Sequence, residues 1–259
     1  MINRIIHLTN YYLKITFNDP VRLILILLWP SVDLLVWGFS AKYFLLIGNN
    51  VTFFHYVLSA FIYWNLVIKA QQEISSQLLM DVNSHNLLNF FISPLSYLEI
   101  YFSLVLSSLI KSIFMLFLLL IFSYVFYYFK LINFDLNSIG IITGLLFFGW
   151  ILGLLSTGFV IRFRNKVSFF TYTLHFLFQP FSCVFYPRSI LPGFFRLISF
   201  LCPPSYLFEG MREISINGKF NYENYYYAFI LLVVYLLISI LIFGALIKSA
   251  KKKGVLLRE

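Results

Sequence analysis

The stretch that decides the fold is Glu73–Glu99, EISSQLLMDVNSHNLLNFFISPLSYLE, the longest polar interruption in a chain made mostly of apolar blocks. Its apolar residues recur at helical spacing, at Leu78, Leu79 and Val82 and again at Leu87, Leu88 and Phe91. This pattern is typical of a short amphipathic helix that lies on a partner protein or on a membrane surface. Apolar blocks flank it on both sides, so we expect a force applied to this helix to pass into them.

The end of this stretch carries a helix-start signal. Ser93-Pro94 breaks the amphipathic pattern, and Ser96 with Glu99 forms an S-x-x-E capping box before a long apolar run. A new helix is therefore predicted to begin near Tyr97.

The composition indicates a membrane protein. Of 259 residues, 61% are hydrophobic and 11% are charged, against roughly 25% charged in soluble domains. The apolar blocks reach the length of about 20 residues that a helix needs to cross a bilayer. The net charge of +9 comes mostly from the ends of these blocks, where membrane lipids account for it, and nucleic-acid binding is not expected.

We expect an all-α polytopic fold that forms one transmembrane domain over residues 1–259. Residues 1–19 read as an interfacial helix ended by Asp19-Pro20, residues 20–247 hold six spans, and residues 248–259 form a basic tail. The expected spans cover residues 23–39, 51–68, 100–129, 139–161, 167–185 and 225–247.

The distribution of Lys and Arg predicts the orientation. With the N-terminus in the cytoplasm, 12 of the 19 fall on the inner side, 6 on the outer side and Lys111 inside a span. The positive-inside rule then places both termini in the cytoplasm. The membrane is expected to be a bacterial cytoplasmic (inner) membrane.

The segment between the fifth and sixth expected spans holds two short helical runs, residues 193–201 and 205–216, around Pro203-Pro204. Neither run can cross a bilayer, and both are apolar, so we expect an outer re-entrant hairpin. Glu209, Arg212 and Glu213 share one helix face. They predict either a local ion pair or a gate at the outer mouth.

Two charges fall inside expected spans, Asp33 and Lys111. Both spans start in the cytoplasm, and the two residues lie at similar depth, about 16 and 18 Å from it. They could therefore pair with each other, or one could face a water-filled pathway. His175 is expected to be a packed or hydrogen-bonded histidine, and a disulfide between Cys183 and Cys202 stays open.

The chain resembles the permease subunits of ABC exporters of the ABC-2 type. The resemblance rests on the interfacial helix and on three further stretches, LLWPSVDLLVWGF (27–39), NLLNFFISPLSYLEI (86–100) and LFQPFSCVFYPRSILPGFFRLISFLCPPSYLFEGMR (177–212). It implies export of a lipid, glycan, polysaccharide or drug. It also implies a homodimer or pseudo-dimer with two ATPase subunits on its cytoplasmic side, and a coupling helix between the second and third spans.

The polar insert and the resemblance together predict the surface that would bind the ATPase. The expected polar contacts are Glu73, Asp81, Asn83, Ser84, His85 and Asn86.

The sequence holds no G-x-x-x-x-G-K-[ST] phosphate loop, and no pattern of catalytic or metal-binding residues. We therefore expect no catalytic site, metal or cofactor on this chain, with Mg-ATP held by the partner subunit. An intramembrane enzyme is disfavoured for the same reason. An ion-coupled secondary transporter stays as the alternative, with Asp33, Lys111 and His175 as proton carriers.

Overall fold

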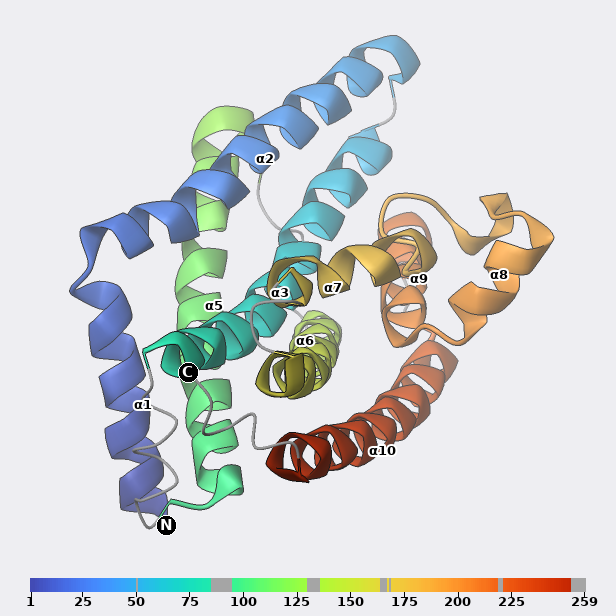
Figure 1. The fold of residues 1–259 in the computed structure, drawn as a ribbon. Helices are drawn as coiled ribbons and strands as arrows, with labels where there is room; N and C mark the ends of the chain where they lie inside the picture. Colours follow the sequence, from blue (N-terminus) through green and yellow to red (C-terminus); the bar gives the residue numbers. More distant parts are fainter. Residues whose placement is uncertain are drawn as a thin grey trace.

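The computed structural model describes residues 1–49, 51–84, 95–129, 136–163, 167, 169–218 and 221–252, which form helices and connecting turns without a β-strand (Figure 1). The elements in chain order are α1 (Ile2–Phe17), α2 (Pro20–Gly48), α3 (Val51–Asn83), α5 (Tyr97–Tyr127), α6 (Leu136–Phe163), α7 (Phe170–Phe178), η2 (Gln179–Phe181), η3 (Arg188–Ile190), α8 (Gly193–Phe200), α9 (Pro203–Asn217) and α10 (Tyr222–Lys252). The predicted all-α class is confirmed over this part of the chain.

Among the described residues, five helices are long and apolar enough to cross a membrane: α2, α3, α5, α6 and α10, with apolar parts of 27 to 31 residues. The fifth expected span, residues 167–185, differs. It contains α7, a helix of only nine residues, followed by the 3₁₀ turn η2. Pro180 lies in that turn, where the ring removes a backbone donor and prevents α7 from continuing as a regular helix.

The second expected span continues beyond its predicted end. It was expected at residues 51–68, but α3 runs for 33 residues to Asn83, about 50 Å of helix. Glu73 and Asp81 are therefore parts of this long helix, and not of a separate amphipathic helix. The apolar run from Leu87 to Phe91 lies outside the described residues.

The predicted capping box of α5 is confirmed in atomic detail, and α2 has a cap that the sequence analysis did not predict. The Asp19 carboxylate accepts a hydrogen bond from the backbone N–H of Val21 at 3.0 Å, at the start of α2. At the start of α5, the Ser96 hydroxyl accepts from the Glu99 N–H, and the Glu99 carboxylate accepts from the Ser96 N–H. These caps satisfy donors that would otherwise have no partner.

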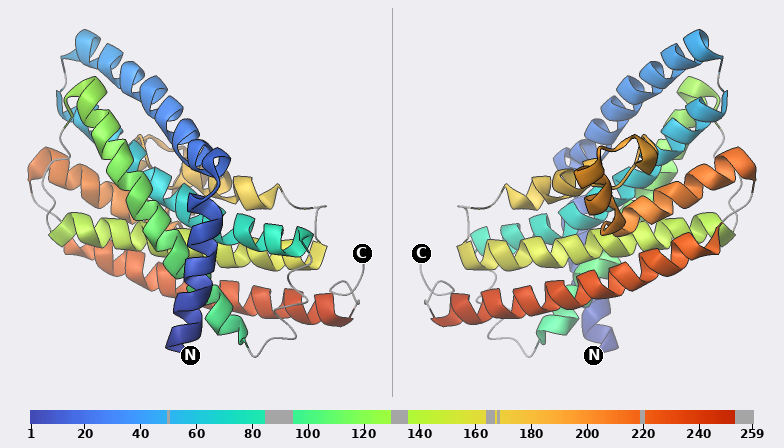
Figure 2. Two further views of the ribbon diagram at one scale, coloured as in Figure 1. Left: turned by 90° about the vertical axis from the view of Figure 1, so that its left-hand side faces the viewer. Right: turned by 90° about the vertical axis from the view of Figure 1, so that its right-hand side faces the viewer.

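The helix α3 makes its most extensive contact with α6, and α6 lies between α3 and α10 (Figure 2). Glycines permit the close approach. A Cβ atom added to Gly149 would lie 2.6 Å from the Ala70 Cβ atom, and one added to Gly153 would lie 3.0 Å from the Ile74 Cβ atom. Small residues at such contacts are characteristic of helices packed within membranes.

The helix α1 lies along α5 (Figure 1), where the Thr9 hydroxyl contacts the Ser103 carbonyl at 3.3 Å. The other end of the molecule carries the short helices α8 and α9, whose bounds match the two predicted runs within two residues. Pro203 and Pro204 open α9, at positions where a missing N–H has no cost.

Candidate functional site

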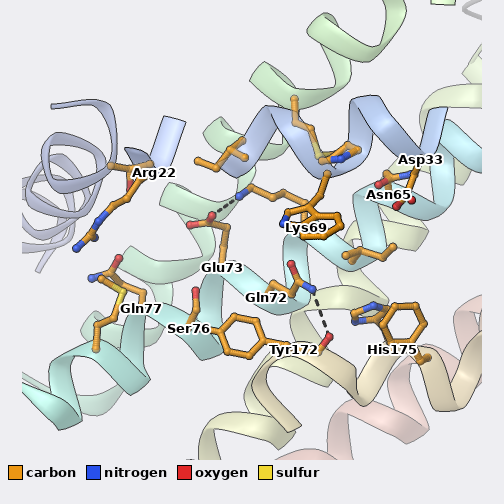
Figure 3. Close-up of a pocket in the computed structure, with 18 residues that line it drawn as sticks. Arg22, Asp33, Asn65, Lys69, Gln72, Glu73, Ser76, Gln77, Tyr172 and His175 are labelled. Atoms are coloured by element: carbon orange, nitrogen blue, oxygen red, sulfur yellow. Dashed lines mark hydrogen bonds and ion pairs between the residues drawn. The ribbon is translucent and has the colours of Figure 1, made fainter. Parts of the chain in front are cut away.

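A cavity of about 510 Å³ lies between α2, α3 and α7 (Figure 3). Thr16 of α1 and Met115 of α5 also line it. Its lining combines charged, amide and aromatic side chains, although the helices that form it are apolar elsewhere. The charged residues are Arg22, Asp33, Lys69 and Glu73, and the aromatic residues other than His175 are Trp29, Tyr172 and Phe176. Ionisable groups of this kind within apolar helices mark functional sites.

The helix α3 supplies one continuous polar stripe to this cavity. Asn65, Lys69, Glu73 and Gln77 follow one another at intervals of four residues, so they share one face of the helix. From Asn65 to Gln77 the stripe extends about 18 Å. It therefore covers more than half of the roughly 30 Å hydrocarbon thickness of a bilayer.

Glu73 lies between two lysines at the centre of this stripe. Its Oε1 atom pairs with Lys69 (Figure 3). Its Oε2 atom is 2.8 Å from the Lys111 Nζ atom. The Lys111 side chain is only 2% exposed. One carboxylate thus neutralises one of two ammonium groups and leaves the group of three with a net charge of +1.

This arrangement corrects the expected pairing of Lys111 with Asp33. The similar depth of the two residues allowed that pair, but Glu73 had been placed in the polar insert outside the spans. Because α3 continues as a helix through Glu73, this carboxylate is the one that meets Lys111.

Asp33 lines the same cavity from α2, three residues after Pro30. Its side chain is exposed toward this space. Its carboxylate forms no ion pair or hydrogen bond with any residue in the described ranges. The cavity therefore contains a carboxylate whose acceptor positions are all unused.

His175 of α7 presents a second unused acceptor. Gln71 fixes its tautomer, because the Gln71 Nε2 atom lies 3.0 Å from the Thr171 carbonyl oxygen and must donate to it. The Gln71 Oε1 atom then accepts, so the His175 Nδ1 atom at 2.9 Å carries the proton. The other ring nitrogen, Nε2, is the lone-pair acceptor of the neutral imidazole. It is buried without a partner among the described residues, on a residue that lines the cavity.

The acids expected to contact a partner are enclosed within the chain. Asp81 is 2% exposed and accepts a hydrogen bond of 3.1 Å from the Tyr12 hydroxyl. Burial and the nearby Asp81 carboxylate raise the pKa of Tyr12 well above its usual range, so this hydroxyl stays protonated. Glu73 is held by two lysines. Both carboxylates are therefore engaged within the chain, and their contact with a partner stays a prediction.

The remaining contacts predicted for a partner lie near the end of α3. Ser84 is exposed there. The side chain of Asn83 is not described, and His85 and Asn86 lie outside the described residues.

A second polar cluster joins α9 to α3. Arg212 pairs with Glu209 at 2.6 Å, as the helical spacing predicted, and it also donates to the Tyr56 hydroxyl of α3 at 2.6 Å. Glu213 accepts from the Asn224 side-chain amide at 3.2 Å. The local ion pair is confirmed for Glu209 and Arg212. Through its hydrogen bond to Tyr56, Arg212 also links α9 to α3.

The cysteines and the metal-binding residue types add no site within the ranges described. Cys183 and Cys202 are both free and buried. Burial raises the pKa of Cys202 to about 12. No group of three His, Cys, Asp or Glu residues in the described chain could hold a metal ion.

Sequence reasoning missed most of the stripe. Asn65, Lys69 and Gln77 were not singled out, and neither was Gln71, which orients His175. The signal was present, because polar residues at four-residue intervals within one long apolar helix predict a shared polar face.

No protein-family model matches the chain, and no curated protein matches it. Its function is therefore inferred from the cavity and from the order of the helices along the chain.

Proposed function

We propose that the chain is the membrane subunit of an ATP-driven exporter of the ABC-2 type, moving a lipid, glycan or drug-like solute across the bacterial cytoplasmic membrane. The observation that carries the proposal is the cavity, where charged and amide groups lie along one face of α3 among apolar helices. Its volume of about 510 Å³ lies within the usual range for ligand sites, about 300 to 1,000 Å³.

The order of elements supports the same proposal. An amphipathic first helix, long apolar helices and a final pair of short helices before α10 follow the order of the stretches that resemble these permeases. We infer six crossings, with α7 and the residues after it as a broken fifth crossing. Both termini would then be cytoplasmic, with α1 on the inner membrane surface and α8 and α9 dipping into the outer leaflet.

The proposal requires partners. Two ATPase subunits would supply Mg-ATP, and a second copy of this chain would complete the pathway. The ATPase would contact the exposed end of α3 near Ser84 and the chain that follows it. Through the enclosed pair of Tyr12 and Asp81, a movement of the ATPase would pass from α3 to α1.

Purification from native membranes tests the proposal. The tagged chain should retain an ATPase that contains a phosphate-binding loop, in equimolar amount, and ATP should drive solute transport by the reconstituted pair. Solute transport by the chain alone, driven by a proton gradient and abolished by a protonophore, would refute it.

A specific observation favours the alternative of an ion-coupled transporter. Asp33 and the His175 Nε2 atom are both unpartnered within the part of the chain described here, and either could accept a proton during transport. Under this alternative Asp33→Asn abolishes gradient-driven uptake, and no ATPase co-purifies.

A further inference from the structure

One end of the cavity gathers hydrogen-bond acceptors that nothing in the described chain satisfies. The Asp33 carboxylate has no partner, and the His175 Nε2 atom is a buried lone-pair acceptor without a donor. Figure 3 shows both residues toward the Asn65 end of the cavity. A carboxylate without a counter-ion is costly among apolar helices. An ammonium group offers three N–H donors and the opposite charge, which would satisfy this end.

The other end carries excess positive charge. Lys69 and Lys111 share the single carboxylate of Glu73. Of the three N–H donors on the Lys69 ammonium group, Glu73 uses one. Ser76 lines the cavity about one turn beyond Glu73 along α3. A group of this kind attracts an anion with several acceptor oxygens, for which a lysine acts as a point charge.

The charges at the two ends of the cavity cancel in sum, but they lie apart from each other. Asp33 contributes −1, and the group of Glu73, Lys69 and Lys111 contributes +1, so the four residues sum to zero. Arg22, also on the lining, is already paired with Asp19 at 3.0 Å. A cation alone would satisfy the first end and leave the second unmatched, whereas an anion alone would do the reverse.

We propose that this cavity binds an ammonium–phosphate zwitterion, with the ammonium group at Asp33 and the phosphate group at Lys69. Asn65, at the level of the acceptor end, and Glu73 lie about 12 Å apart along α3, which separates the two subsites. The ring of Trp29 also lines the cavity and offers a face that attracts cations. This inference rests on the proposed function and names the class of solute for it.

Two sources share this chemistry, the headgroup of phosphatidylethanolamine and free phosphoethanolamine. The water-soluble compound is tested by calorimetric titration of the purified chain in a maltoside detergent. O-phosphoethanolamine is compared with its two halves, ethanolamine and inorganic phosphate. We expect the zwitterion to bind about tenfold to a hundredfold more tightly than either half, because each charge-assisted contact contributes that much.

Two variants locate the charges. Asp33→Asn removes a carboxylate that makes no hydrogen bond or ion pair in the described structure, so the protein should fold. The zwitterion should then bind to this variant no more tightly than phosphate does. In Lys69→Gln, the zwitterion should bind no more tightly than ethanolamine does. Glu213→Gln is the matched control, since it changes a carboxylate outside the cavity, and it should leave all three affinities unchanged.

The lipid is tested by mass spectrometry of lipids that co-purify with the chain. Enrichment of phosphatidylethanolamine over the bulk membrane, lost in Asp33→Asn, identifies the headgroup as the ligand. Binding of free phosphoethanolamine without that enrichment identifies the soluble compound. The zwitterion proposal is overturned if neither is bound, if one half binds as tightly as the whole, or if Asp33→Asn changes nothing. None of these measurements uses an ATPase, so failure to recover one refutes the proposed function alone.

Discussion

Replacing Glu73 by Gln should be the most damaging single change in the cavity. The substitution keeps the shape of the side chain but removes the negative charge with which Lys111 pairs at 2.8 Å in the described structure. Lys111 is 2% exposed, so water cannot replace the lost carboxylate. Breaking a buried ion pair from one side costs about 3–5 kcal/mol. That is a large part of a typical stability of about 5–15 kcal/mol.

A double-mutant cycle measures this cost. Glu73→Gln, Lys111→Met and the double variant are compared by reversible unfolding, with folded yield from size-exclusion chromatography as a second readout. Removing both charges should recover part of the loss, with a coupling energy of about 1–3 kcal/mol. The reasoning fails if the two single effects add within about 0.5 kcal/mol. Asp33→Asn combined with Lys111→Met is the control, and it should be additive because those residues do not pair.

Three further outcomes are expected. Gly149→Ala should destabilise the protein by about 1–3 kcal/mol, because the new Cβ atom would lie 2.8 Å from an α3 carbonyl oxygen. Gly244→Ala is the control and should be tolerated in the same unfolding assay, because no atom of the described residues lies within 4 Å of the new Cβ atom. Maleimide should leave Cys202 unmodified in the folded protein from pH 7 to 9 and should label it after denaturation. The reason is that burial raises the pKa of Cys202 to about 12 and keeps the thiol protonated. Labelling of Cys202 in the folded protein, mapped by mass spectrometry, would contradict this. Arg212→Gln should lower the melting temperature, since it leaves the Glu209 carboxylate without its ion pair. Arg212→Lys should restore little of the loss, because one ammonium group cannot reproduce the geometry of a guanidinium. Equal melting temperatures for the wild-type protein and both variants would contradict a stabilising role for this ion pair.

The features that the sequence predicted correctly depend on local chemistry. The capping box at Ser96 and Glu99 involves residues three apart and forms as expected. The break at Pro203-Pro204 separates α8 from α9 because a proline cannot continue a helix but can begin one. Signals of this kind are carried by a few neighbouring residues, and tertiary packing did not override them.

The features that the sequence did not predict depend on contacts between distant segments. Depth along the spans suggested that Lys111 would meet Asp33, but helix rotation decides which side chains face each other, and Lys111 faces Glu73. Hydropathy ended the second span near Lys69 because polar residues begin there. In the structure those residues stay helical and turn inward, where lysines and carboxylates satisfy one another. Periodicity, rather than average hydropathy, carried that information.

The length of α3 has a mechanical consequence. Near Ala70 this uninterrupted helix is held against the glycines of α6. One arm from that contact extends about 21 Å to Tyr56, which touches Arg212 of α9, and the other about 16 Å to Asp81, which touches Tyr12 of α1. If α3 tilts about this contact, its two ends move in opposite directions. The displacement at Tyr56 is then about 1.3 times the displacement at Asp81, which is the ratio of the two lengths. A push on α1 would then reach α9 reversed in direction and slightly amplified.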